Sequence, residues 1–206
     1  MTAPPRVTAG FAQEIAAVVA QLRHITVQVR TRRAATGAGI LWNTGEPEGS
    51  GLVITNAHVV QGNQATIELG DGSVARARVV ARDPKRDLAA LELELEPAGA
   101  MVAAVVRDSR PLRVGELVIA IGHPGGFVGA ATLGIVHADE GARDGRTPRW
   151  VRADVRLAPG FSGGPLADAA GRLVGVNTMI QGSLALAVPA ATVAAWIRRS
   201  HALVAS

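Results

Sequence analysis

Residues 91–96 have the sequence Leu-Glu-Leu-Glu-Leu-Glu, in which apolar and acidic residues alternate without interruption. Because successive side chains of a β-strand point to opposite faces, we expect the leucines to face a core and the glutamates to face water. The segment therefore predicts a half-buried β-strand, and its glutamates are interpreted as a solvated strand face and not as an acidic binding site.

Short apolar segments separated by turn residues continue on both sides of this strand. The expected strands are residues 25–29, 39–42, 52–55, 65–69 and 74–81 before it, and residues 117–121, 132–137, 151–154, 173–178 and 183–188 after it. The 24 glycines and 11 prolines favour many turns. Short strands at such spacing are typical of a β-sandwich or a β-barrel, so the sequence predicts an all-β chain.

Helical patterns are confined to the two ends. Residues 9–23 carry apolar residues at helical spacing, with Thr8 as the expected N-cap. Residues 190–199 predict a closing helix with Val193 and Trp196 on one face. Residues 97–111 show neither pattern and predict a linker between two halves.

The composition of the 206 residues limits the possible functions. With 48% hydrophobic and 18% charged residues, the chain is expected to fold as one domain, or as two small subdomains that share one site. Without cysteine it has no disulfide, no thiolate zinc site and no cysteine nucleophile. The pI of about 11.1 follows from a net charge of only +4, because the chain has no Tyr or Cys to titrate between His and Lys. The arginines are scattered and have no aromatic partners, so the high pI does not indicate nucleic-acid binding.

The sequence predicts neither an export signal nor a membrane span. The amino-terminal residues lack a basic start followed by a clean apolar run, because Gln13 and Glu14 interrupt the one candidate. No stretch of about 18 apolar residues is present. We therefore expect a cytoplasmic location in a bacterium.

Three segments carry residue types that together support nucleophilic catalysis. Residues 55–60 read Thr-Asn-Ala-His-Val-Val, Asp87 precedes Leu-Ala-Ala, and residues 159–166 read Pro-Gly-Phe-Ser-Gly-Gly-Pro-Leu. A serine hydroxyl becomes a good nucleophile only when a base takes its proton, and a carboxylate must hold the imidazole in the right tautomer. His58, Asp87 and Ser162 follow the order of the chymotrypsin template, and we predict that they form a catalytic triad.

A glycine next to Ser162 has a further expected role. Negative charge that develops on a substrate oxygen must be met by N–H donors. Gly160 can adopt backbone angles that present such a donor. The N–H groups of Gly160 and Ser162 are therefore the predicted oxyanion hole.

These segments resemble the HtrA/DegP family of trypsin-like serine proteases. The similarity includes residues 37–39, 55–60, 87–89, 120–124, 134–136, 160–166, 175–178 and 187–189, and it extends over about residues 12–198. The resemblance implies two six-stranded antiparallel β-barrels with short terminal helices and with the triad between the barrels. It implies one protease domain over residues 1–206, made of one barrel at about 25–96, the linker at 97–111, the second barrel at 112–188 and the closing helix at 190–199.

The chain departs from the family pattern at three points. Phe161 replaces a small polar residue next to the nucleophile, Ala185 stands where the family usually has glycine, and no PDZ domain is expected after the protease domain. The resemblance also implies polypeptide substrates. It further implies either a homotrimer, formed through the N-terminal segment with Phe11, or a monomer.

By the same resemblance, an extended substrate pairs with the strand near residues 183–187. The substrate-binding residues are then Leu157, Phe161, Ser183, Leu184, Ala185 and Leu186. None of them is acidic, so we expect cleavage after small or medium aliphatic residues and not after Lys or Arg.

Other interpretations of these residues have less support. Residues 160–164 also fit the G-x-S-x-G elbow of α/β-hydrolases, but that fold places its histidine after the serine, and the only later histidine is His201. His24, His123 and His137 are interpreted as structural or surface residues. No spacing indicates a metal site, and no cofactor is expected. The alternative to an endopeptidase is a weak or inactive protease fold that binds or scaffolds peptides.

Overall fold

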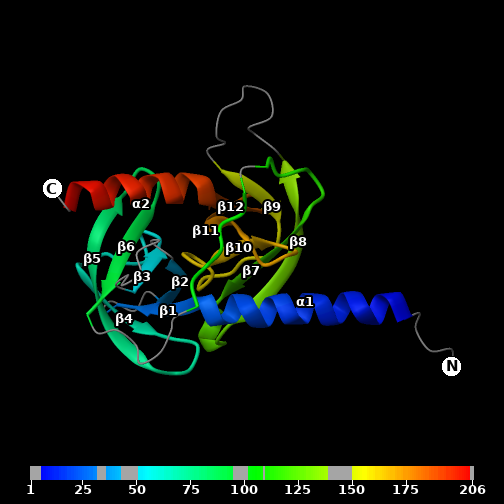
Figure 1. The fold of residues 1–206 in the computed structure, drawn as a ribbon, viewed down its shortest axis with the longest axis horizontal. Coiled ribbons are helices and arrows are strands. Elements are labelled where there is room, and N and C mark those ends of the chain that lie inside the picture. The colour runs from blue at the N-terminus through cyan, green and yellow to red at the C-terminus, as the bar shows by residue number, and fades with distance from the viewer. Residues whose placement is uncertain are drawn as a thin grey trace.

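The computed structural model describes residues 6–31, 36–42, 51–94, 102–108, 110–138 and 150–204. In this part of the chain, two closed six-stranded antiparallel barrels lie side by side, with one α-helix near each end of the sequence (Figure 1). This arrangement confirms the predicted all-β fold with two six-stranded barrels and terminal helices.

The first barrel contains strands β1 to β6. They are β1 (Thr26–Arg30), β2 (Thr36–Trp42), β3 (Leu52–Thr55), β4 (Gln64–Glu68), β5 (Val74–Asp83) and β6 (Leu88–Leu93). Their order around the barrel is β1-β2-β3-β6-β5-β4, and β4 closes it by pairing with β1.

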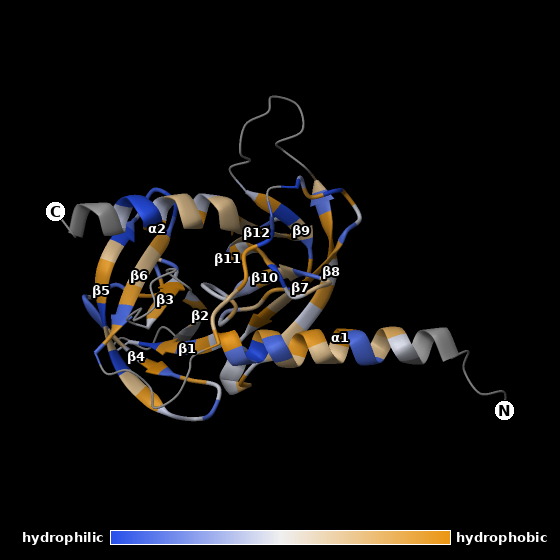
Figure 2. Cartoon of the chain, viewed as in Figure 1, coloured by the Kyte–Doolittle hydropathy of each residue, from blue (hydrophilic) through white to orange (hydrophobic). Residues whose placement is uncertain are grey.

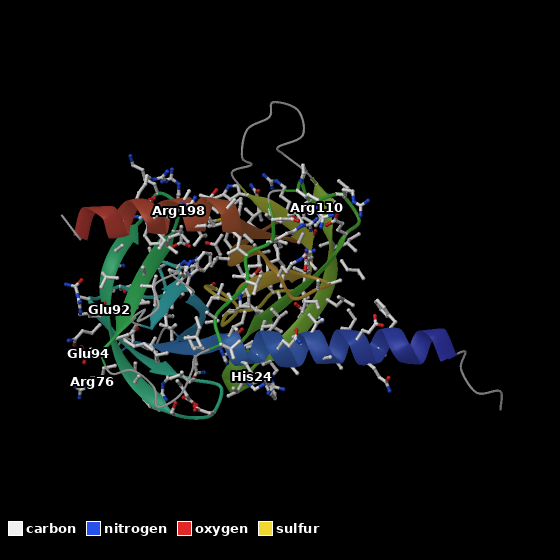
Figure 3. All side chains as sticks on the ribbon, in the orientation of Figure 1. His24, Arg76, Glu92, Glu94, Arg110 and Arg198 are labelled. Atoms are coloured by element: carbon white, nitrogen blue, oxygen red, sulfur yellow. The ribbon has the colours of Figure 1, made fainter. Side chains whose placement is uncertain are left out.

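Strand β6 shows the alternation that the sequence predicts. Leu91 and Leu93 are buried, while Glu92 is half-buried and Glu94 is exposed at the outer edge of the barrel (Figure 3). Glu92 forms an ion pair with Arg78 of the neighbouring strand β5. The last two residues of the alternating segment lie outside the described residues.

The second barrel contains strands β7 to β12. They are β7 (Leu117–Gly122), β8 (Ala130–Ala138), β9 (Val151–Asp154), β10 (Pro165–Asp168), β11 (Leu173–Gln181) and β12 (Leu184–Pro189). Their order is β10-β11-β12-β9-β8-β7, and β10 closes the barrel by pairing with β7. Strand β10 was not predicted, because it begins at a proline that directly follows two glycines and these residues are typical of a turn.

The two helices are longer than predicted. α1 spans Arg6–Ile25 and α2 spans Ala190–Val204. Because Thr8 lies inside α1, the prediction that it is the N-cap is wrong. Figure 2 shows apolar and polar residues alternating along α1, and its apolar Val18 and Leu22 pack on the core. Among the described residues, neither helix is long and apolar enough to span a membrane.

The hydrophobic core has three parts. One cluster that includes Val53 fills the first barrel, and another that includes Phe161 fills the second. The third cluster contains Ile54 from the first barrel, Ile121 from the second barrel and Trp196 from α2. The barrels are therefore joined by a shared apolar layer, and this layer sets the distance between the loops that each barrel contributes.

Residues 102–108 contact both barrels. Ala104 forms a parallel bridge to Trp42 of β2, and Val106 forms one to Leu173 of β11. Arg107 in the same segment donates to Glu116 at 2.5 Å, and this hydrogen bond lowers the pKa of Glu116 to about 2. Residues 97–101 and residue 109 of the predicted linker lie outside the described residues.

Candidate active site

His58 and Asp87 lie on two turns of the first barrel. His58 is in the turn at residues 57–59 that follows β3, and Asp87 ends the turn between β5 and β6. Nδ1 of His58 lies 2.7 Å from Oδ2 of Asp87, and the backbone N–H of His58 donates to Oδ1 at 3.0 Å. The ring contact orients the imidazole, and the backbone contact holds the same carboxylate beside it.

The backbone of Asp87 is held in an uncommon conformation. Its φ of 56° is the only positive value at a non-glycine residue in the described part of the chain. Aspartate reaches this left-handed region more easily than most residues. The buried side-chain amide of Asn56 donates to the carbonyl oxygen of Asp87 at 2.9 Å. This hydrogen bond holds the turn whose carboxylate faces His58.

Thr178 of β11 connects Asp87 to the second barrel. Its hydroxyl donates to Oδ2 of Asp87. Its carbonyl oxygen accepts a hydrogen bond from the hydroxyl of Ser162 at 3.3 Å. Thr178 therefore contacts both the carboxylate and the candidate nucleophile. In this structure the Ser162 hydroxyl donates to Thr178 and not to the imidazole of His58.

These contacts set the charge of the His58–Asp87 pair. The hydrogen bond with Asp87 raises the pKa of His58 against the opposing effect of burial. Burial by itself raises the pKa of Asp87, but hydrogen bonds from His58 and Thr178 outweigh it and lower this pKa. The side chain of His58 is 51% exposed and that of Asp87 is 18% exposed. An ionised carboxylate behind an accessible imidazole suits general-base catalysis.

Arg82 holds the loop that carries His58. Its guanidinium donates to the carbonyl oxygens of Ala57, Val60 and Gly62. The guanidinium presents several N–H donors in a fixed planar arrangement, so one side chain can satisfy three carbonyl groups. These three residues lie on either side of His58, and the loop is therefore fixed to β5 around the imidazole.

Ser162 lies on the loop between β9 and β10, and this loop packs on the first barrel. The backbone N–H of Ala38 in β2 donates to the carbonyl oxygen of Ser162 at 2.8 Å. Gly163 has a φ of 84°, and a Cβ atom there would lie 2.2 Å from both the Ala38 carbonyl oxygen and Oγ1 of Thr55. The close approach requires glycine at position 163. It brings the candidate nucleophile from the second barrel to the edge of the first.

The backbone N–H groups around Ser162 divide into two sets. Three of them donate to backbone carbonyl groups, namely those of Phe161, Gly163 and Gly164. Within the described residues, the N–H groups of Gly160 and Ser162 have no hydrogen-bond partner. Gly160 has a φ of 108°, and a Cβ atom there would lie 2.5 Å from the carbonyl oxygen of His123. The two free donors beside the Ser162 hydroxyl are the pair that the sequence analysis assigned to the oxyanion hole.

The residues predicted to bind substrate do not form one surface. Three of them are at most 3% exposed, namely Phe161, Ala185 and Leu186. The other three reach the surface wholly or in part, namely Leu157, Ser183 and Leu184. Phe161 and Ala185 belong to the apolar cluster inside the second barrel. The side chain of Phe161 therefore faces the core, where the sequence analysis had expected a pocket wall.

The expected pairing of a substrate with residues 183–187 is contradicted at residues 185–187, because β12 has a partner on each edge there. Leu186, for example, pairs with Met179 of β11 and with Arg152 of β9. A strand paired on both edges has no backbone groups left for a third strand. In contrast, β10 pairs only with residues 173–176 of β11, so among the strands that the structure describes, residues 178–181 lie beside β12 only.

Three residues of the site were not predicted from the sequence, namely Asn56, Arg82 and Thr178. Each acts through contacts with residues distant in sequence, and Thr178 and Asp87 are 91 positions apart. Asn56 and Thr178 do lie in segments that match the HtrA/DegP pattern, at residues 55–60 and 175–178. That match is the one signal that could have identified them.

Three further histidines have described side chains, and none of them has a hydrogen bond to His58 or Asp87. His123 is 3% exposed, its Nδ1 accepts a hydrogen bond from the N–H of Gly129 at 3.2 Å, and burial lowers its pKa. His24 and His137 are exposed. The described residues contain no group of three or more His, Cys, Asp or Glu side chains that could hold a metal ion.

The chain is similar in sequence to known proteins. A family model described as a trypsin-like peptidase domain matches residues 37–176. The serine protease HhoB of Synechocystis sp. is 36% identical over 171 residues, which are 78% of this chain and 39% of HhoB. A DegP-like periplasmic serine endoprotease of Brucella suis is 36% identical over 171 residues, which are 78% of this chain and 32% of that protein. HhoA of Synechocystis sp. is 36% identical over 168 residues, which are 77% of this chain and 41% of HhoA. The chain spans about a third to two fifths of the length of these curated relatives.

Proposed function

The chain belongs to the trypsin-like peptidase family, and from this premise we propose that it is a serine endopeptidase that cleaves unfolded or exposed protein segments through an acyl-enzyme. One observation carries the proposal. Asp87 binds His58 of its own barrel and Thr178 of the other barrel, and Thr178 binds the Ser162 hydroxyl. A carboxylate, an imidazole base and a hydroxyl nucleophile from distant parts of the sequence are therefore linked by hydrogen bonds at one site, as nucleophilic catalysis requires.

In the first step, the Ser162 hydroxyl turns from the Thr178 carbonyl toward Nε2 of His58 when a substrate binds. Oγ attacks the scissile carbonyl carbon while Nε2 takes the hydroxyl proton, and Asp87 stabilises the imidazolium through Nδ1. The negative charge on the carbonyl oxygen is met by the free N–H groups of Gly160 and Ser162.

In the second step, the C–N bond breaks and the leaving amine takes the proton from His58. The acyl group is then an ester of Ser162. A water molecule gives a proton to His58 as its oxygen attacks this ester, and His58 then returns the proton to Oγ as the C–Oγ bond breaks, which releases the carboxylic acid product and restores the free serine.

The substrate is proposed to extend along residues 178–181 of β11. In the described part of the chain these residues have a strand on one edge only, begin at the residue that contacts Ser162, and include the exposed Met179 and Ile180. An extended peptide can add its backbone hydrogen bonds to such an edge. The surface residues Leu157 and Leu184 carry no charge, so we propose small or medium aliphatic residues before the scissile bond.

A fluorophosphonate probe tests the proposal directly. Attack by Ser162 on phosphorus expels fluoride and leaves a stable phosphonylated serine, so mass spectrometry should map the label to Ser162. The Ser162→Ala variant should lose the label and should lose casein turnover by roughly 10⁴-fold or more. Equal rates of casein turnover in the wild type and in Ser162→Ala would refute the proposed peptidase activity and favour a peptide-binding role. Cleavage of a peptide panel only after Arg would refute the proposed specificity.

A further inference from the structure

Phe161 stands between the two free N–H donors, yet its side chain points away from them. The residue is 3% exposed and packs in the core of the second barrel with Val118, Val136 and Ala185. A Cβ atom at Gly122 would lie 2.6 Å from the Phe161 Cα and 2.8 Å from its Cδ1. The end of β7 therefore makes room for this residue by carrying glycine.

The backbone of Phe161 is held as firmly as its ring. Its N–H donates to Ala158 at 3.1 Å, and its carbonyl oxygen accepts from the N–H of Gly164 at 3.0 Å. The carbonyl oxygen of Gly160, in the peptide unit that precedes Phe161, accepts from the N–H of His123 at 2.9 Å. Rotation of this peptide unit would break two of these hydrogen bonds.

Planar peptide geometry links these contacts to the donors. The N–H of Ser162 belongs to the peptide unit that runs from the Cα of Phe161 to the Cα of Ser162. Its direction is fixed once the Phe161 Cα and the adjoining torsion angles are fixed. A ring buried in the core fixes that Cα, because the side chain cannot move without opening a cavity.

We propose that Phe161 is a positioning residue. Its buried ring keeps the turn at residues 158–164 in the conformation that leaves the N–H groups of Gly160 and Ser162 free before substrate binds. The proposal rests on the proposed peptidase function. It implies that the hole is ready in the free protein, and that apolar packing holds it there.

Kinetics of substitutions at position 161 test the proposal. Phe161→Ala should lower kcat for a peptide substrate at least 30-fold with KM changed less than threefold, because the oxyanion contact forms in the transition state. Phe161→Leu, which keeps apolar bulk, should recover most of the loss. The acid side of the pH profile should keep its position in both variants, because His58 and Asp87 lie on the other barrel.

Val136→Ala is the matched control, since Val136 belongs to the same cluster and lies on β8. It should lower Tm and leave kcat within twofold of the wild-type value. The proposal is overturned if folded Phe161→Ala keeps kcat within threefold, if Phe161→Leu is as slow as Phe161→Ala, or if Val136→Ala lowers kcat equally.

Hydrogen–deuterium exchange separates this proposal from the proposed function. In Phe161→Ala, the amides of residues 158–164 should exchange at least tenfold faster, with no change at residues 56–58. If the wild-type protein shows no turnover but this local change appears, the peptidase function fails and the positioning of the turn stands. Unchanged exchange at residues 158–164 refutes the positioning role whether or not the protein is active.

Discussion

The two barrels hold their parts of the site by different means. The first barrel supplies His58 and Asp87, and it fixes them with directed hydrogen bonds from Asn56 and Arg82. The second supplies a hydroxyl and two backbone N–H groups on a turn shaped by glycine, with Phe161 packed beneath it. Side chains that carry charge are thus held by polar contacts, and backbone donors are held by steric fit together with backbone hydrogen bonds of the same turn. Substitutions on the first barrel should therefore change proton chemistry, and those on the second should change the stabilisation of the transition state.

The largest effect is expected on the first barrel, from Asp87→Asn. Asparagine keeps the shape but offers an N–H to Nδ1 of His58, which favours the wrong tautomer of the imidazole. We expect kcat to fall by roughly 10⁴-fold. Steady-state kinetics with a labelled peptide measures it. Asp83→Asn, in the same turn, is the control, because Asp83 pairs with Arg86 and not with His58, and it should leave kcat nearly unchanged. Equal losses in the two variants would show that Asp87 acts only on the turn.

A smaller effect is expected on the second barrel, from Gly160→Ala. The φ of 108° and the 2.5 Å approach to the His123 carbonyl oxygen exclude a Cβ atom, so the turn must shift. We expect the loss of one donor and a fall in kcat of roughly 10²- to 10³-fold.

The fluorophosphonate labelling rate should fall in parallel with kcat in Gly160→Ala. Gly62→Ala is the control, because a Cβ atom there meets nothing within 4 Å. Wild-type kinetics in Gly160→Ala would contradict the steric account of the turn.

The smallest effect is expected where the barrels meet, from Thr178→Val. The variant loses one hydrogen bond to Asp87 but keeps the carbonyl that contacts Ser162, so kcat/KM should fall about fivefold, equivalent to about 1 kcal/mol. Thr26→Val is the control, since Thr26 is buried and its hydroxyl binds Leu22 away from the site.

The pH profile of the wild type and of Thr178→Val sharpens this prediction. Asp87 raises the pKa of His58 above its ordinary value of 6.5, and the base works only when neutral. In both proteins kcat/KM should therefore increase with pH through an apparent pKa above 6.5. A midpoint below 6.5 would contradict the coupling between His58 and Asp87.

Local patterns in the sequence were enough for the all-β class, and the resemblance to the HtrA/DegP family implied the two six-stranded barrels. The predicted strand at residues 91–96 is confirmed for residues 91–93, which end β6, and the short apolar segments around it also form strands. Strand β10 was missed because Pro165 and the preceding glycines are typical of a turn, and tertiary pairing with β7 and β11 overrode that local preference. Thr8 was misplaced because helix boundaries depend on contacts beyond the local sequence.

The contacts around the predicted triad could be identified only from the three-dimensional structure. His58, Asp87 and Ser162 could be chosen from residue type and order, since each lies in a recognisable segment. Sequence could not show that Thr178 binds Asp87, or that the ring of Phe161 faces the core, because each depends on packing between distant segments. The pairing of β12 on both edges, which excludes it as the substrate strand, is likewise a tertiary fact.

The contact between the Ser162 loop and β2 has a consequence during synthesis on the ribosome. The Ser162 carbonyl needs the N–H of Ala38, made much earlier, and the N–H of Gly163 needs the carbonyl of Asn177, made later. A nascent chain that has completed only its first barrel therefore carries a base and an acid with no nucleophile in place. The proposed triad is therefore complete only after β11 has emerged and folded.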